Sequence, residues 1–401
     1  MEHKNIRKLD SSALLIFILT IGVFGIINTE MGVVGILPLI AETFQVSVPQ
    51  AGWTVGVFAL VVAVSAPVTP LLFSRINRKT MMLLALGLFT ISNVISMLTT
   101  HFTVLLVARI LPALLHPVYV SMAFTVAASS VRKENAPKAV AKVFIGVSAG
   151  MVLGVPVTSV IASEGSFSMA MLFFAVVNAL VFVATVLFVP SMPVKGRISY
   201  GEQLSVLKRP VMWHSIIAVT LINGAMFGFF SYMSDYLKQV TGIPYAMISG
   251  MLLIYGAANI IGNLLSGKLL SMNANRCMMA IPLILLITYV CLFVNGEWMI
   301  AMAVILLILG ILAGIASNGM QYMITQAAPE ALDFANGLFL TSANLGTTIG
   351  TAVCGVFITQ WGTHYSVFGA LLFLILSMVF VYLRIRETQS EAQVTVQTVT
   401  H

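Results

Sequence analysis

Four ionisable residues stand inside or at the edge of long apolar runs, where a charged side chain is costly. Glu30, Arg109 and His116 lie well inside such runs, and Asp235 lies near the end of another. A carboxylate in an apolar span must be paired, protonated or in contact with water. Because desolvation favours the neutral form of a carboxyl group, Glu30 is a candidate proton-binding residue.

The two acids among these residues, Glu30 and Asp235, each allow two interpretations. Glu30 and Arg109 stand at similar depths in their runs, which predicts that they pair. The pair is either a fixed structural contact or a proton site switched by a partner that comes and goes. Asp235, close to Lys238, is either an interfacial acid beside water or a second acid that binds a proton or another cation.

His116 follows Arg109 by seven residues, or about two helical turns, so both are expected on one helical face. Pro112 and Pro117 bracket His116 and are expected to bend the helix and free backbone carbonyls. Histidine titrates near neutral pH, so His116 either binds substrate or relays protons. The alternative is a neutral histidine that a neighbouring helix satisfies.

The composition requires a membrane around these residues. Of the 401 residues, 59% are hydrophobic and only 8% are charged, whereas about 25% are charged in a typical soluble domain. The apolar residues form runs of about 20, the length that spans a bilayer. These values exclude a soluble enzyme and indicate a polytopic protein whose main partner is the lipid bilayer.

The apolar runs predict twelve membrane-spanning helices. A polar linker at 191–211 separates two halves, 1–190 and 212–387, and the tail at 388–401 is expected to be disordered. The expected spans are 13–37, 50–72, 79–99, 103–128, 137–161, 167–190, 212–237, 244–270, 276–294, 298–327, 333–358 and 363–384.

The basic residues support this topology and give it an orientation. With the amino terminus in the cytoplasm, 18 of the 20 Lys and Arg residues fall in cytoplasmic segments, as the positive-inside rule requires. Lys238 lies on the other side, and Arg109 lies within a span. We therefore expect both termini in the cytoplasm, and we attribute the net charge of +7 to topology, not to nucleic-acid binding.

Three motifs resemble those of the major facilitator superfamily, in its bacterial twelve-helix drug and sugar efflux branch. The basic part of the family's first cytoplasmic loop motif is matched by Ser74-Arg75-Ile76-Asn77-Arg78-Lys79, with Ser74 in place of an acid and Asn77 in place of a glycine. The fourth-helix arginine motif resembles Leu105-Leu106-Val107-Ala108-Arg109, and the antiporter motif resembles Gly146-x-x-x-Gly150-x-x-x-Gly154-Val155-Pro156. The segments Asn28-Thr29-Glu30 and Ala113-Leu114-Leu115-His116 are most similar to sugar-efflux and arabinose-efflux type exporters.

The resemblance implies an all-α membrane protein of two pseudo-symmetric six-helix bundles around a central cavity. It implies proton-coupled export of sugars, sugar-like solutes or amphiphilic drugs across the bacterial cytoplasmic membrane. Uptake symport by the same fold and export of nucleosides or purines are alternatives, and a passive channel or a membrane enzyme is a more distant one. The sequence carries no His-Glu-x-x-His motif, and its Gly-x-Ser-x-Gly match, Gly146-Val147-Ser148-Ala149-Gly150, lies inside an expected span and not at a strand-to-helix turn. We therefore expect no enzyme, metal or cofactor, a proton gradient as the energy source, and a monomer.

Each group of candidate residues has an expected role. Proton coupling is assigned to Glu30, Arg109 and Asp235. Polar side chains within spans should face the interior and contact substrate, namely Asn28, His116, Asn223, Tyr232, Tyr255, Asn259, Gln321 and Asn344. Gating and conformational change are assigned to Arg75, Arg78, Lys79 and to the closely packing ladder Gly146, Gly150, Gly154 and Pro156.

Overall fold

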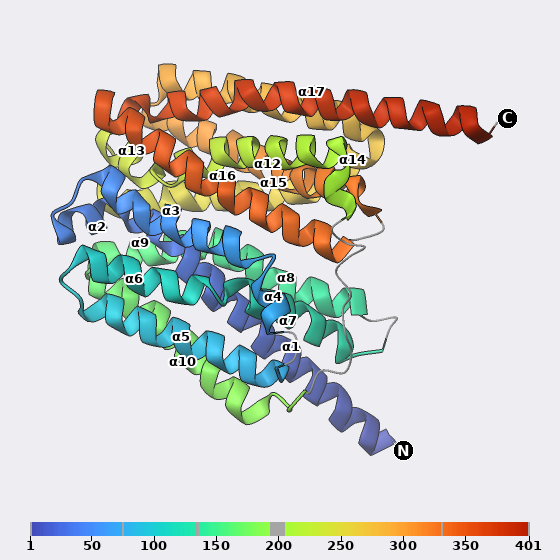
Figure 1. The fold of residues 1–401 in the computed structure, drawn as a ribbon. Coiled ribbons are helices and arrows are strands. Elements are labelled where there is room, and N and C mark those ends of the chain that lie inside the picture. The colour runs from blue at the N-terminus through green and yellow to red at the C-terminus, as the bar shows by residue number, and fades with distance from the viewer. Residues whose placement is uncertain (1, 74–75, 133–135, 193–204, 330–331, 400–401) are drawn as a thin grey trace. The chain divides into compact units, whose positions relative to one another are not determined.

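The computed structural model describes residues 2–73, 76–132, 136–192, 205–329 and 332–399. Every regular element in these ranges is an α-helix or a short 3₁₀-helix (Figure 1). The expected all-α fold is therefore confirmed. It follows from the length of the apolar runs, since a backbone in lipid satisfies its hydrogen bonds within each helix.

The chain forms two compact units, each with its own core. The N-terminal unit comprises Met1–Gly196 with Pro244–Leu253, and the C-terminal unit comprises Arg197–Ile243 with Ile254–His401. Each is described by itself below.

In the N-terminal unit, serine or asparagine caps begin three of the helices, at Ser47, Asn77 and Ser166. Figure 1 shows α5 and α10 side by side, and α1 packs along α8. The elements of the unit are α1 (Glu2–Met31), η1 (Gly32–Ile36), α2 (Leu37–Phe44), α3 (Val48–Ser65), α4 (Thr69–Leu72), α5 (Arg78–Leu98), α6 (Phe102–Ala113), α7 (His116–Ser129), α8 (Ala136–Val152), α9 (Gly154–Glu164) and α10 (Phe167–Phe188).

In the C-terminal unit, α12 packs against α16 and α17, with backbones brought together at Gly224, Gly346 and Gly350. A β-carbon on Gly346 or Gly350 would meet the backbone of α12, so only glycine allows this approach. The elements are η3 (Ser205–Lys208), α12 (Pro210–Phe230), α13 (Met233–Gln239), α14 (Tyr245–Asn295), α15 (Met299–Ala327), α16 (Leu332–Trp361), η5 (Thr363–Tyr365) and α17 (Ser366–Val399).

The described helices agree with the expected number of spans. Ten helices are long and apolar enough to cross a membrane, and α8 with α9 makes an eleventh as a pair bent by 40°. The 51-residue α14 has non-helical dihedral angles at Asn273 and is long enough for the two expected spans 244–270 and 276–294. With α14 counted as two spans, the described residues hold twelve candidate spans.

Two segments differ from expectation. The first expected span, 13–37, is interrupted, since α1 ends at Met31 and is followed by η1 and α2. The tail at 388–401 was expected to be disordered, but α17 continues to Val399. Gln, Glu and Ala, which fill the beginning of this tail, are good helix formers, so the polar composition alone did not predict an end to the helix.

Candidate functional site

Two helix breaks in the N-terminal unit shape the candidate site. The helix that carries Arg109 ends at Ala113, and a new helix begins at His116 with Pro117 in its first turn. The bend expected from Pro112 and Pro117 is therefore an interruption of two residues, Leu114 and Leu115, which keep right-handed helical dihedral angles, and Phe102–Ala127 still forms one candidate span. Arg109 belongs to α6 and His116 to α7.

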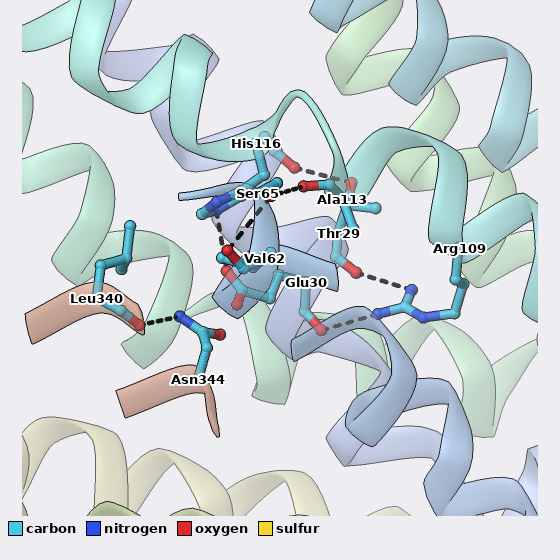
Figure 2. Close-up of polar contacts among 10 residues, drawn as sticks. Thr29, Glu30, Val62, Ser65, Arg109, Ala113, His116, Leu340 and Asn344 are labelled. Carbon is cyan, nitrogen blue, oxygen red and sulfur yellow. Dashed lines mark hydrogen bonds and ion pairs between the residues drawn. The ribbon is translucent and has the colours of Figure 1, made fainter. Parts of the chain in front are cut away.

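Glu30 and His116 point toward one another at these breaks (Figure 2). Nε2 of His116 lies 3.1 Å from Oε2 of Glu30, within ion-pair distance, although the two groups are not aligned as a hydrogen bond. The residues are 2% and 7% exposed, respectively. Water therefore does not screen the pair, and a change of charge on either partner strongly affects the other.

Arg109 binds the backbone of the first helix, not the carboxylate of Glu30. Its guanidinium donates to the carbonyl oxygens of Thr54 at 2.6 Å, Thr29 at 3.1 Å and Glu30 at 3.1 Å. Its Cζ lies 4.9 Å from the ring centroid of Phe58, and the centroid of the His116 ring lies 6.0 Å from the same ring. Residues 29 and 30 lie in the last turn of α1, and a cation at a helix C-terminus is favourable.

A buried polar network holds the turn of α1 that carries Glu30. Nδ2 of Asn93 on α5 and Nδ2 of Asn178 on α10 both donate to Oγ1 of Thr29, at 3.3 Å and 3.0 Å. Thr29 in turn donates to the carbonyl oxygen of Gly25 at 2.9 Å. The sequence analysis did not select Asn93 or Asn178, although an amide inside an apolar span was the available signal.

The glycine ladder brings α8 and α9 against α1. A β-carbon on Gly146 would meet the carbonyl of Thr20, and one on Gly150 would lie 2.8 Å from the Cβ of Ile27. A β-carbon on Gly154 would meet the amide of Asn28. Pro156 lies in α9, just after the bend that follows Val152. The ladder therefore packs against the helix that carries Glu30.

Four of the expected substrate-contacting residues are buried in helix contacts. Nδ2 of Asn223 donates to the Ala343 carbonyl on α16, and the hydroxyl of Tyr232 donates to the Thr351 carbonyl at 3.0 Å. The amide of Asn344 donates to the Leu340 carbonyl of its own helix, as Figure 2 shows. Asn28 is buried against α9. The contacts of Asn28, Asn223 and Tyr232 join two helices, whereas that of Asn344 lies within α16.

The other expected substrate residues of the C-terminal unit remain partly or fully exposed. Tyr255 stacks on Phe230 with ring centroids 4.6 Å apart, and Gln321 donates to Asn336 at 3.0 Å. Asn259 accepts from Asn263 at 2.9 Å, and Asn263 accepts from Asn318 of α15 at 2.6 Å. This half-exposed row of amides is available to a polar ligand.

The described residues of the basic loop, which were assigned to gating, make contacts with α10 and with the segment that follows it. Nζ of Lys79 donates to the Val186 carbonyl at the end of α10, at 2.9 Å, within the N-terminal unit. The backbone amide of Arg78 donates to the Met192 carbonyl. Arg75 lies outside the described residues.

Asp235 is fully buried, which contradicts the interpretation as an interfacial acid beside water.

Two further buried or half-buried groups of the C-terminal unit were not selected from the sequence. Arg384 donates to Oγ of Ser215 and to the Met323 carbonyl, and Nδ1 of His214 lies 2.7 Å from Oε2 of Glu387.

Long apolar helices broken around buried charges are the features of a multi-pass membrane transporter, and the comparisons with known proteins agree. A family model described as Major Facilitator Superfamily matches residues 18–332 and 272–399. The chain belongs to this superfamily, whose members are transporters and not enzymes.

Similar proteins support the same class. The chain is 29% identical over 348 residues to the inner membrane transport protein YdhP of Escherichia coli (strain K12), covering 87% of this chain and 89% of that protein. It is 29% identical over 343 residues to the MFS-type transporter YtbD of Bacillus subtilis (strain 168), covering 84% and 87%.

A solved structure shares the fold. It is the inward-facing, unoccupied form of a bacterial homologue of the human lysosomal transporter Spinster, with a TM-score of 0.77 and 17% sequence identity. The match covers 94% of this chain and 97% of that one. At this identity the likeness concerns the fold alone.

Proposed function

We propose that the protein is a proton-coupled antiporter that exports a small molecule across the bacterial cytoplasmic membrane by alternating access. The observation that carries the proposal is the buried pair of Glu30 and His116, with 3.1 Å between Nε2 and Oε2. The membership of the transporter superfamily supplies the frame, and the pair supplies a proton site within it.

The pair is suited to carrying a proton because a carboxylate and an imidazole each have an atom that can bind one. With Glu30 ionised and His116 protonated, opposite charges attract across 3.1 Å in a buried place. When a proton neutralises Glu30, this attraction is lost and the protonated imidazole is left buried without a counter-charge, which is unfavourable. Proton binding therefore changes the energy of the arrangement that holds α1 against α7.

The helix breaks give this change a mechanical consequence. Glu30 lies in the last turn of α1, and His116 is the first residue of α7. Residues at the ends of broken helices can shift without disrupting a continuous backbone ladder. Arg109 keeps the end of α1 fixed to α6 and α3, so the proton-dependent movement is expected at α7.

Export in exchange for protons, as opposed to uptake, is favoured by the glycine ladder of α8 and α9. Gly146, Gly150 and Gly154 match the antiporter motif, and they pack the bent α8–α9 pair onto the helix that carries Glu30. A sliding contact between these helices would connect proton binding with conformational change. We expect both termini in the cytoplasm and a monomer.

The substrate classes proposed are sugars and sugar-like solutes or amphiphilic drugs. The half-exposed amides of Asn259, Asn263 and Asn318 suit hydroxyl groups, whereas the stacked Phe230 and Tyr255 suit an apolar or aromatic face. Export of nucleosides, which present both chemistries, is the second candidate for the same reason.

The proposal is tested by substrate-evoked proton release. Purified protein is screened by thermal shift against sugars, nucleosides, chloramphenicol-like drugs and lipophilic cations. The compound that raises the melting midpoint is then added to weakly buffered protein with a pH indicator. We expect proton release from wild type and from Glu42→Gln, an exposed acid of α2, and none from Glu30→Gln. Binding without proton release in the wild-type protein would contradict antiport and favour a passive carrier or channel.

A further inference from the structure

Asp235 is a buried acid that the proposed Glu30 site does not use. It lies in α13 of the C-terminal unit and is 0% exposed. A carboxylate withdrawn completely from water is unfavourable unless charges or hydrogen-bond donors replace the water. Its surroundings therefore indicate which protonation state the structure favours.

The hydrogen bonding around Asp235 suits the neutral acid. Oγ1 of Thr363 donates to Oδ2 at 2.8 Å, whereas the buried Oδ1 has no well-aligned hydrogen bond among the described residues. Burial raises the pKa of Asp235 and outweighs the Thr363 and Gln239 side chains and the Lys238 charge, which lower it. If Oδ2 carries a proton, it can donate to the threonine hydroxyl, and Oδ1 is then an uncharged carbonyl oxygen. Leaving a neutral oxygen unpaired costs less than leaving half of a carboxylate unpaired.

The charges around Asp235 do not replace the missing donor. Lys238 on α13 and Glu297 before α15 are exposed, and neither forms an ion pair with Asp235 in the part of the chain described. Tyr232 and Tyr236 flank Asp235 along the chain, and their hydroxyl groups donate to the carbonyls of Thr351 and Leu292.

Asp235 is covered by a small group of segments, here named the α13 cap. The α13 cap consists of α13, which carries Asp235, residues 292–296 and η5. The segments are tied by Thr241 to the Gly296 carbonyl at 2.7 Å and by Nε2 of His364, in η5, to the Phe293 carbonyl at 2.8 Å. The hydroxyl of Tyr236 fills the place where a β-carbon on Gly296 would lie. Asp235 and Thr363 join α13 to η5 by a hydrogen bond, beside the edge contact of the Tyr236 and His364 rings at 6.2 Å.

We propose that Asp235 is a second proton-binding site, which holds a proton while the α13 cap is closed and releases it to water when the cap opens. The released proton passes from Oδ2 to a water molecule, and the carboxylate that remains needs the hydration that the closed cap denies. Cap opening and proton release are therefore linked. The site lies in the C-terminal unit and stands independently of Glu30.

Infrared spectroscopy of the purified protein in lipid nanodiscs tests the proton directly, with pH titration alone and no substrate. We expect a carboxylic acid C=O band that persists at neutral pH in wild type and in Glu30→Gln and Glu297→Gln. Asp235→Asn should remove it. A wild-type band that survives in Asp235→Asn would overturn the assignment, and a band lost only in Glu30→Gln would assign it to Glu30 instead.

A second pair of variants keeps the test valid if Asp235→Asn folds poorly. A hydroxyl that donates to the ionised form favours ionisation, so Thr363→Val should raise the midpoint of band loss by about one pH unit. Thr363→Ser should restore the wild-type midpoint. Equal midpoints in the three proteins would overturn the role of this contact.

Hydrogen–deuterium exchange, corrected for the intrinsic effect of pH, tests the link to the cap. Peptides covering α13 and η5 should exchange faster in wild type once the pH passes the midpoint of band loss. In Asp235→Asn, which stays neutral, they should remain protected throughout. The same pH dependence in Asp235→Asn and wild type would show that Asp235 does not control the cap.

Discussion

Replacing Arg109 by lysine tests the claim that a guanidinium fork, and not merely a positive charge, holds the end of α1. Arg109 makes three hydrogen bonds to the carbonyls of Thr54, Thr29 and Glu30, and it is 4% exposed. Lysine keeps the charge but presents a point charge on a flexible stem. It cannot reach carbonyls on α1 and α3 with the same planar geometry.

The magnitude follows from the bonds that are lost. Each hydrogen bond to a charged group contributes about 1.5–3 kcal/mol, so losing two of the three would cost about 3–6 kcal/mol. Partial repacking of the ammonium reduces this, and we expect a destabilisation of about 2–4 kcal/mol. For a unit of roughly 200 residues, at about 2–4 °C per kcal/mol, this lowers the melting midpoint by about 4–16 °C.

The assay is thermal unfolding of the detergent-purified protein followed by tryptophan fluorescence. Arg132→Lys is the matched control, since Arg132 is exposed and the substitution is the same. We expect the control to melt like wild type. Arg109→Lys with an unchanged melting midpoint would refute the reasoning, because it would mean that the three carbonyls need only a nearby charge.

Three further predictions concern packing and buried polar contacts. Gly150→Val places side-chain atoms against Ile27 and should lower transport and destabilise the protein by about 1–3 kcal/mol. The control Gly267→Val, at a position with open space, should change neither; thermal unfolding and transport of the screened compound are the measurements. Asn178→Leu leaves the Thr29 hydroxyl with fewer partners and should lower the melting midpoint and weaken the pH dependence of binding, as titrated by fluorescence. Arg384→Met removes the hydrogen bonds to the Met323 carbonyl and to the Ser215 hydroxyl and should destabilise the protein by about 2–4 kcal/mol in thermal unfolding, whereas Arg386→Met, at an exposed position, should have no effect.

The sequence was sufficient for the fold because apolar run length and the positions of Lys and Arg are direct consequences of crossing a membrane. It also located the break between α6 and α7, since Pro112 and Pro117 remove backbone donors there. The division of α14 at Asn273 was found for the same reason, namely a polar interruption between two apolar runs.

The partners of buried charges were not predictable in the same way. From the sequence, either Arg109 or His116 could pair with the carboxylate of Glu30. The structure shows that His116 meets the carboxylate and that Arg109 binds the backbone carbonyl instead. The position of Asp235 near the end of a run left open whether it is an interfacial acid beside water or a second acid that binds a proton or another cation. Its contact with Thr363 of η5, 128 residues further along the chain, is not visible in the sequence. Arg384 resembled a loop cation in sequence, and only the packing of α17 shows that it is buried.

Uphill transport by Glu30→Gln tests the central claim most directly. Wild type, Glu30→Gln and the control Glu42→Gln are reconstituted in proteoliposomes, and accumulation of the compound found by thermal shift is measured after a pH jump. Exchange at equal pH on both sides is measured in parallel. We predict that Glu30→Gln loses accumulation but keeps exchange and pH-independent binding, whereas Glu42→Gln behaves like wild type. Accumulation by Glu30→Gln against the gradient at the wild-type rate would contradict the assignment of proton coupling to Glu30.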